Sequence, residues 1–123
     1  MNRDKILIID DDEKIQFAFH SLLEKEGLEG VKATNGSVAL DLIKSNHFTA
    51  IFLDLALPDM DGLKILELIR NIDKIIPVII ISSMVTSEET KEFQKLGIAE
   101  FIEKPLSLYK IREILHNIVS HQK

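Results

Sequence analysis

Four short apolar runs of this sequence are each followed by side chains that could do chemistry. Three aspartates at positions 10–12 follow one run, and Asp54 follows another. Ser82 closes a third run, and Lys104 comes just after a fourth. If the runs are parallel strands of one sheet, these side chains meet at the edge where the carboxyl ends of the strands lie. Carboxylates, a hydroxyl and an ammonium group would then share one site.

Such a group of carboxylates needs positive charge beside it. Two carboxylates about 4 Å apart repel each other by roughly 4 kcal/mol at an effective dielectric constant near 20. Lys104 supplies one charge, but oxygen ligands suit a hard divalent cation such as Mg²⁺, which needs only one or two protein carboxylates beside phosphate oxygens. These residue types predict phosphoryl chemistry: a carboxylate attacks phosphorus, the cation and the lysine neutralise the phosphoryl oxygens, and a hydroxyl donates to one of them.

Each residue alone also has an ordinary structural explanation. Asp12 is well placed to cap a helix, Ser82 fits a turn hydroxyl, and Lys104 fits a solvated charge. Only their joint placement at one sheet edge favours a site over these separate explanations.

Apolar spacing predicts the strands that would carry these residues. Continuous apolar runs at 5–9, 49–53 and 77–81 are typical of strands buried on both faces of a parallel sheet. Weaker runs at 30–33 and 99–102 predict an inner strand and an edge strand, respectively.

Helices are predicted between the strands. Residues 12–26 carry apolar side chains at helical spacing, with Gly27 as the expected C-terminal cap. Thr86–Glu89 matches a capping box that opens a polar helix, and Ser107 is the expected N-cap of the last helix. The apolar face of that last helix would consist of Leu108, Ile111, Leu115 and Ile118. Turns or helix starts are expected at Asn35-Gly36 and Asp61-Gly62.

The alternation of strands and helices predicts an α/β fold, a doubly wound sheet with right-handed crossovers. A length of 123 residues favours a single domain over 1–123. The net charge of -5, without a basic stripe, argues against direct binding of nucleic acid. The absence of cysteine, of a signal peptide and of any apolar stretch near 18 residues predicts a cytoplasmic protein with no membrane span.

Four sequence elements, in this order, resemble the signature of the receiver (response-regulator) domain of two-component signalling, over essentially the whole chain. They are Ile6–Asp11, Leu53–Leu55 leading into Leu57–Gly62, Ile80–Ser83, and Lys104-Pro105. The resemblance implies a flavodoxin-like (βα)5 fold, with a five-stranded parallel sheet in the order 2-1-3-4-5 and five helices. It also implies phosphorelay signalling, in which a histidine kinase or histidine phosphotransferase domain passes a phosphoryl group from its phosphohistidine to the receiver.

The resemblance assigns roles to individual residues. Asp54 would be the phosphoacceptor. Asp10 and Asp11, together with Asp54 and the main-chain carbonyl of Ala56, would hold Mg²⁺, with Mn²⁺ as a possible substitute. Lys104 would pair with the aspartate or with its phosphate.

Switching residues follow from the same resemblance. Ser82 would move towards the phosphoryl oxygens, and Phe101 would rotate between buried and exposed states. Because Phe101 has no hydroxyl, its two states can differ only in packing. Pro105 is joined to the preceding lysine by a cis peptide in many family members.

Two apolar residues, Ala56 and Met84, lie at the positions that tune dephosphorylation in the family. Neither can orient a water molecule by hydrogen bonding, so slow loss of the phosphoryl group is expected. The domain would be a switch rather than an enzyme, promoting only its own phosphorylation and slow dephosphorylation. Its output would be a downstream protein or a fused domain, and it would act as a monomer or a phosphorylation-dependent dimer.

Phe17 lies nearly opposite the apolar stripe of the first predicted helix. It is either an isolated surface hydrophobe, which is common, or, with Ile15, a docking contact for the kinase or phosphotransferase. The polar fourth helix has few apolar anchors beyond Phe93 and Leu96. It is either a solvated face or a loosely held element that can shift between two states.

Rival functions assign the same residues differently. A haloacid-dehalogenase-like phosphatase would use Asp10 as nucleophile and Asp12 as acid/base, with Ser82 and Lys104 on the phosphate. That chemistry needs a further acidic pair after the lysine, where only Glu113 is found, and it gives Asp54 no role. A degenerate receiver would only bind a partner. A nucleotide-binding protein would want a glycine-rich loop after the first strand, where this sequence has three aspartates.

Overall fold

The computed structural model describes residues 3–83 and 85–121, and strands and helices alternate along them. The elements are β1 (Lys5–Ile9), α1 (Glu13–Lys25), β2 (Glu29–Ala33), α2 (Gly36–Ser45), β3 (Ala50–Asp54), α3 (Gly62–Ile72), β4 (Val78–Ser82), α4 (Ser87–Leu96), β5 (Glu100–Glu103) and α5 (Leu108–His121). The predicted fivefold βα repeat is confirmed.

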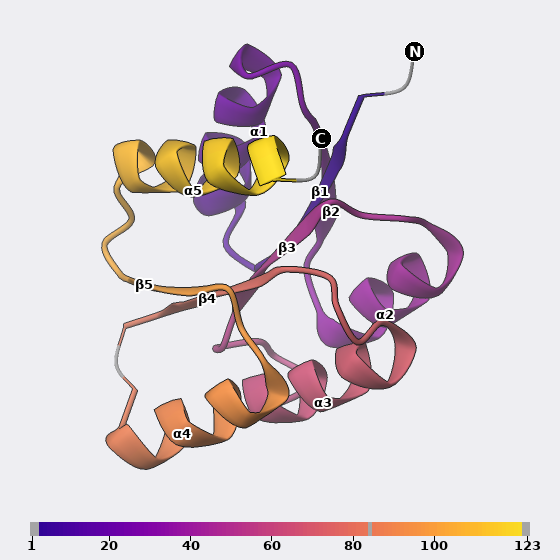
Figure 1. The fold of residues 1–123 in the computed structure, drawn as a ribbon, viewed down its shortest axis with the longest axis vertical. Coiled ribbons are helices and arrows are strands. Elements are labelled where there is room, and N and C mark those ends of the chain that lie inside the picture. The colour runs from indigo at the N-terminus through magenta and orange to yellow at the C-terminus, as the bar shows by residue number, and fades with distance from the viewer. Residues whose placement is uncertain (1–2, 84, 122–123) are drawn as a thin grey trace.

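The strands form one parallel sheet in the order β2-β1-β3-β4-β5. Helices α1 and α5 cover one face of the sheet, and α2, α3 and α4 cover the other (Figure 1). The predicted doubly wound fold and strand order are therefore confirmed. The expectation of an inner strand at 30–33 is wrong, because β2 lies at the edge with β1 as its neighbour. Its exposed Lys32 suits that edge position.

The central strands are buried on both faces, which explains their continuous apolar sequences. Alternate residues point to opposite layers. The side chains that pack with α2, α3 and α4 are Leu7, Ile9, Ile51, Leu53, Val78 and Ile80. Those that pack with α1 and α5 are Ile6, Ile8, Phe52, Ile79 and Ile81. The sheet is thus a rigid platform whose carboxyl edge carries the polar residues.

The helix ends follow from local sequence. Asp12, Asn35, Asp61 and Thr86 are the N-caps of α1 to α4, and Thr86 forms the predicted capping box with Glu89. After α1, Gly27 has φ +73° and the N–H of Leu28 donates to the carbonyl of Leu23 at 2.9 Å, as in a Schellman motif. These predicted helix boundaries are confirmed.

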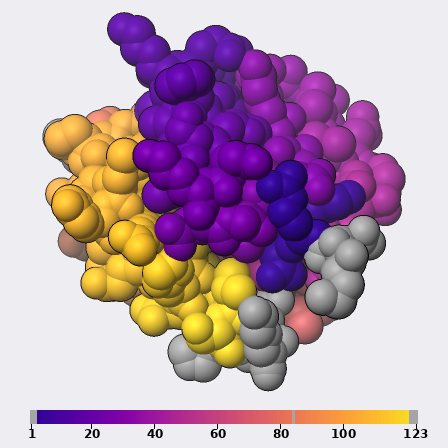
Figure 2. Space-filling view, turned by 90° about the horizontal axis from the view of Figure 1, so that it is seen from above, coloured from indigo at the N-terminus to yellow at the C-terminus, as the bar shows by residue number. Residues whose placement is uncertain are grey.

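Helices α1 and α5 lie side by side on their face of the sheet (Figure 2). The carboxylate of Glu26, just after α1, contacts the Arg112 guanidinium at 3.3 Å and the His116 imidazole, both on α5. Ser107 caps α5 as predicted, accepting from the Lys110 N–H at 3.4 Å. Leu108 is 49% exposed rather than buried, because it lies in the first turn of the helix, before the buried Ile111.

Helix α4 is fastened mainly at its carboxyl end. The Arg70 guanidinium of α3 donates to the carbonyls of Leu96 at 2.9 Å and Gly97 at 2.6 Å. It also donates to the main-chain carbonyls of Asp73 and Ile76, in the segment that precedes β4. Phe93 is the buried residue of α4, in agreement with the predicted shortage of apolar anchors. Among the residues that the structure describes, no helix has the length and apolar character needed to cross a membrane.

Candidate functional site

Strand register brings the predicted site residues together. Ile9 pairs with Leu53 across β1 and β3, so the residues that follow them, Asp10 and Asp54, are neighbours. Asp54 pairs in turn with Ile81, which precedes Ser82. The N–H of Lys104 donates to the Ser82 carbonyl at 2.9 Å, which brings the lysine to the same edge.

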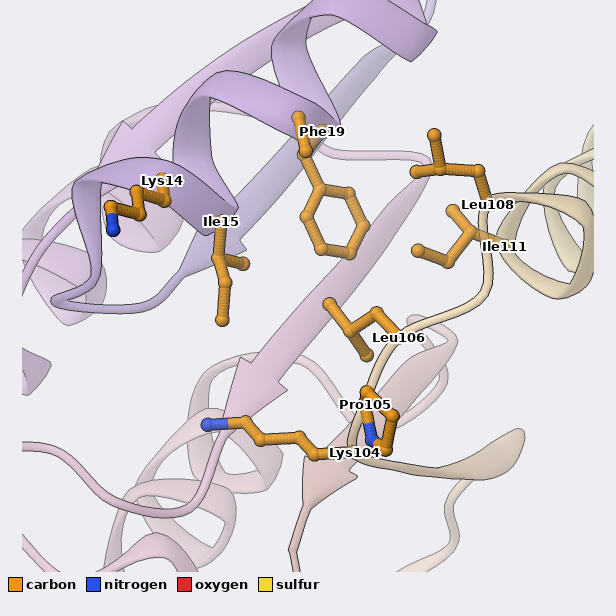
Figure 3. Close-up of a pocket in the computed structure, with 9 residues that line it drawn as sticks. Lys14, Ile15, Phe19, Lys104, Pro105, Leu106, Leu108 and Ile111 are labelled. Carbon is orange, nitrogen blue, oxygen red and sulfur yellow. The ribbon is translucent and has the colours of Figure 1, made fainter.

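Asp54 is the centre of this arrangement and is only 2% exposed. Its Oδ1 lies 3.2 Å from the Nζ of Lys104 and accepts from the N–H of Ala56 at 3.3 Å. The Lys104-Pro105 peptide is cis. Figure 3 shows the lysine ammonium directed away from the apolar side chains that follow it, Pro105 and Leu106.

Three carboxylates lie close enough to hold a metal ion. One oxygen each of Asp10, Asp11 and Asp54 falls within 4.8 Å of the others. Asp10 is fully buried; its Oδ1 accepts from the Asp12 N–H at 2.9 Å, whereas its buried Oδ2 has no hydrogen-bond partner. A buried carboxylate oxygen without a partner is costly. A hard divalent cation is the partner that an all-oxygen ligand set would accept, so the residues fit such an ion.

The pKa of Asp10 reflects first its burial and then its neighbours. Burial raises it from 3.8 to about 6, a hydrogen bond from the Asp12 main chain opposes the rise, and the charge of Asp54 adds to it. Lys104 lowers the pKa and Asp11 raises it, both to a smaller extent. The metal-free site therefore favours a protonated Asp10 in mildly acidic solution.

We expect this raised pKa to make the metal-free protein less stable as the pH rises from about 4 to about 6. In that range the folded state keeps the Asp10 proton that the unfolded state releases, so ionisation costs more in the fold. Urea unfolding in EDTA at several pH values measures the effect, with Asp10→Asn as reference. The stability of wild type relative to Asp10→Asn should fall over this range, and a difference independent of pH would contradict the expectation.

The residues between 6 and 116 match the family model described as the response regulator receiver domain. This chain belongs to that family. Receiver domains are signalling switches of phosphorelays, and the fold described above is theirs.

Relatives of known name support the assignment. The receiver domain is 34% identical to the sporulation initiation phosphotransferase F of Bacillus subtilis over 92% of this chain and 91% of that protein. It is 37% identical to a putative response regulator NtrX-like of Rickettsia bellii over 86% of this chain, but it spans only 23% of that protein. The same fold is therefore found in a protein of this length and as a part of longer ones.

Solved structures agree with the fold in detail. A receiver domain protein of Methanospirillum hungatei superposes with a TM-score of 0.92 at 26% identity, covering 98% of this chain and 97% of that chain. The receiver domain of the Francisella response regulator 1452 gives a TM-score of 0.88 at 30% identity, covering 98% of this chain and all of that one.

Other predicted residues of the receiver domain take the following places. Ser82 is buried at the end of β4. Phe101 is partly buried on β5 and meets the Phe93 ring edge-on, with centroids 5.7 Å apart. Ala56, two residues after Asp54, donates its N–H to the Asp54 carboxylate, and the role of the Ala56 carbonyl as a metal ligand stays a prediction. Met84 lies outside the described residues.

The side chain of Asp12 caps α1, accepting from the N–H groups of Lys14 at 2.8 Å and Ile15 at 3.4 Å. The structural explanation of this residue is therefore confirmed. The cap accounts for Asp12 without any catalytic role. The receiver family match gives the phosphatase alternative no support.

Sequence reasoning missed two polar residues of the receiver domain. Asp59 accepts from the N–H groups of Gly36 at 2.8 Å and Ser37 at 3.1 Å, which holds the segment after β3 against the start of α2 and lowers the pKa of its carboxyl. The position of Asp59 inside the Leu57–Gly62 motif could have pointed to this role. Gln16 is the other, buried on the inner side of α1.

A groove beside the site separates α1 from the loop before α5 (Figure 3). Its volume is about 340 Å³, and Ile15 of α1 and Leu106 of the loop are among the residues that line it. Phe17 is 75% exposed and borders a different, shallow hollow with His20 and Ser21. The two predicted docking residues of the receiver domain thus lie on different sides of α1.

Proposed function

We propose that this receiver domain accepts a phosphoryl group on Asp54 from a phosphohistidine of a histidine kinase or phosphotransferase domain. The observation that carries the proposal is the placement of Asp54 at the end of the central strand, 3.2 Å from the Lys104 ammonium and within the carboxylate cluster. The nucleophile, its neutralising cation and a metal-binding acid pair thus share one site.

An oxygen of Asp54 would form the new O–P bond as the N–P bond of the phosphohistidine breaks, and the leaving imidazole would keep that electron pair. Lys104 neutralises the aspartate before transfer and a phosphoryl oxygen after it. Mg²⁺, or Mn²⁺ in its place, held by Asp10, Asp11, Asp54 and the Ala56 carbonyl, would neutralise the charge on the transferred group.

The test is incubation of the purified protein with acetyl phosphate or phosphoramidate and Mg²⁺, followed by intact mass measurement. The expected result is the addition of one phosphoryl group in Mg²⁺, and no addition when EDTA is present during the incubation. An unmodified mass at saturating Mg²⁺ would count against the proposal, as would an adduct of equal yield in EDTA.

The output of the switch follows the same proposal. Ser82 would donate to the phosphoryl group, and the segment that follows Ser82 would move with it. Phe101, which is edge-on to Phe93 in this structure, would then change its packing. A downstream protein or a fused output domain would read the change, through a monomer or a phosphorylation-dependent dimer. Slow loss of the phosphoryl group, from apolar Ala56 and Met84, stays a prediction. So do a cytoplasmic location and a single domain over 1–123.

Phe17 is proposed to contact the phosphodonor protein. It projects from the helix that begins directly after the acidic triplet, and its ring gains nothing from the core at 75% exposure. We expect Phe17→Ser to slow transfer from a phosphorylated histidine kinase or phosphotransferase domain by about tenfold, the effect of losing roughly 1.4 kcal/mol of docking energy. The rate is measured by the decay of the phosphorylated donor.

Two controls separate docking from damage. Phe17→Ser should leave the melting temperature and the labelling by acetyl phosphate unchanged, because a small donor needs no docking surface. Ile75→Ser removes another exposed side chain, 89% accessible before β4, and should leave protein transfer at the wild-type rate. Wild-type transfer kinetics in Phe17→Ser would remove Phe17 from the docking surface.

A further inference from the structure

Gln16 is a buried amide among apolar neighbours. It is 2% exposed, on the face of α1 that also buries Phe19 and Leu23. Of the buried polar side chains within 3–83 and 85–121, it is the one that a helix carries, since the others lie at strand ends or beside them. A buried amide in a helix needs partners for its donors and its acceptor.

Its donors are used at the carboxyl ends of β1 and β2. The Nε2 of Gln16 lies 2.9 Å from the carbonyl of Ile8, 2.9 Å from that of Asp10 and 3.3 Å from that of Ala33. The Ala33 carbonyl also accepts from the N–H of Asp10 at 3.0 Å. Both main-chain polar groups of Asp10 are therefore fixed, one by β2 and the other by Gln16.

The partners at the two ends of the Gln16 amide determine which way it is turned. Three carbonyls can only accept, so the nitrogen of Gln16 must face them and its Oε1 must face His20. His20 meets that oxygen with Nε2 at 3.1 Å, which requires the Nε2–H form of the ring. Gly30 makes room for the imidazole, because a Cβ there would lie 2.6 Å from the His20 Nδ1.

We propose that Gln16 is a positioning residue for the metal-binding Asp10. The chain of contacts runs from His20 through the Gln16 amide to the Asp10 carbonyl, and the carboxylate of the same Asp10 carries the buried oxygen without a partner. Holding that main chain still directs the side chain towards Asp11 and Asp54. The proposal rests on the proposed function, because it takes the carboxylate cluster as the Mg²⁺ site.

Two side chains of similar size, methionine and glutamate, would not reproduce these contacts. A methionine at position 16 would fill the same volume without donors and would leave the carbonyls of Ile8 and Asp10 without the amide. A glutamate would bring a carboxylate against three carbonyl oxygens, acceptor against acceptor. The requirement is for N–H donors at this place, which is why the test removes the donors and keeps the shape.

The experiment measures Mg²⁺ binding by isothermal titration calorimetry in wild type and in Gln16→Met, with no phosphodonor present. We expect the Kd for Mg²⁺ to rise by about tenfold, as is usual when a group that orients a metal ligand is lost. The metal-induced shifts of the Asp10, Asp11 and Asp12 amides in ¹⁵N correlation spectra should shrink in parallel. Gln94→Met, which changes an exposed amide on α4, is the matched control and should bind as wild type does.

A purely structural role predicts lower stability in urea with an unchanged Kd, and that result would overturn the proposal. If Gln16→Met does not fold, His20→Phe decides, because it keeps the ring volume beside Gly30 and removes the donor to Oε1. Weaker Mg²⁺ binding in His20→Phe supports the proposal, and an unchanged Kd overturns it. A wild-type protein that binds no Mg²⁺ overturns the metal site as well, whereas equal binding by wild type and variants overturns only the role of Gln16.

Discussion

Asp54→Asn is expected to take up no phosphoryl group from acetyl phosphate, whereas the wild-type protein takes up one. The amide has the shape of the carboxylate and can still accept from the Ala56 N–H, but it has no anionic oxygen to attack phosphorus. Intact mass after incubation with Mg²⁺ gives the answer directly. The variant removes the charge of Asp54 that raises the pKa of Asp10, but it also breaks the ion pair with Lys104, so its melting temperature is measured alongside the mass.

Two further variants make the result decisive. Asp12→Asn keeps a good N-cap for α1 and should be phosphorylated as wild type is, because Asp12 serves the helix. Asp10→Asn should weaken labelling by weakening metal binding, so that higher Mg²⁺ concentrations restore part of it. An adduct that persists in Asp54→Asn and vanishes in Asp10→Asn at every Mg²⁺ concentration would instead support the phosphatase chemistry.

Phe52→Ala is expected to lower the free energy of unfolding by about 3–5 kcal/mol. Phe52 is fully buried in the middle of β3, and its ring lies 4.9 Å from that of Phe19 on α1. Its loss leaves a cavity between the central strand and the helix layer that a rigid sheet cannot close. Because a domain of this size is stable by only about 5–15 kcal/mol in all, urea unfolding should show a greatly lowered midpoint.

Phe17→Ala is the matched control, since it removes the same ring from a position that is 75% exposed. Its effect on stability should stay within about 0.5 kcal/mol. Equal losses in the two variants would mean that the packing between β3 and α1 contributes less than its burial indicates.

The sequence predicted those features that depend on neighbouring residues along the chain. Buried strands are continuous apolar runs, and the caps at Asp12 and Thr86 are short polar signals that act on the next turn. The grouping of Asp10, Asp54 and Lys104 followed from one further rule, that parallel strands present their carboxyl ends at a common edge.

Features that depend on distant partners were harder to predict. The edge position of β2 depends on which strand pairs with it, and periodicity within the strand does not contain that information. Leu108 matches the apolar face of α5, but its exposure depends on where the packing against α1 ends. Gln16 did carry a signal, because it shares the i, i+3, i+7 spacing of Phe19 and Leu23. What the sequence could not give was the position of the three carbonyls it meets.

The two ends of α4 are held in different ways. The Arg70 guanidinium holds the carbonyls of Leu96 and Gly97, whereas the amino end is completed by its own capping box, Thr86 with Glu89. The amino end follows Ser82 in the chain by a few residues, after Val85, which packs against the core. We expect a displacement at Ser82 to reach α4 first at this end, whereas the hydrogen bonds from Arg70 restrain the other end. The switch would thus be transmitted mainly through the first turn of α4.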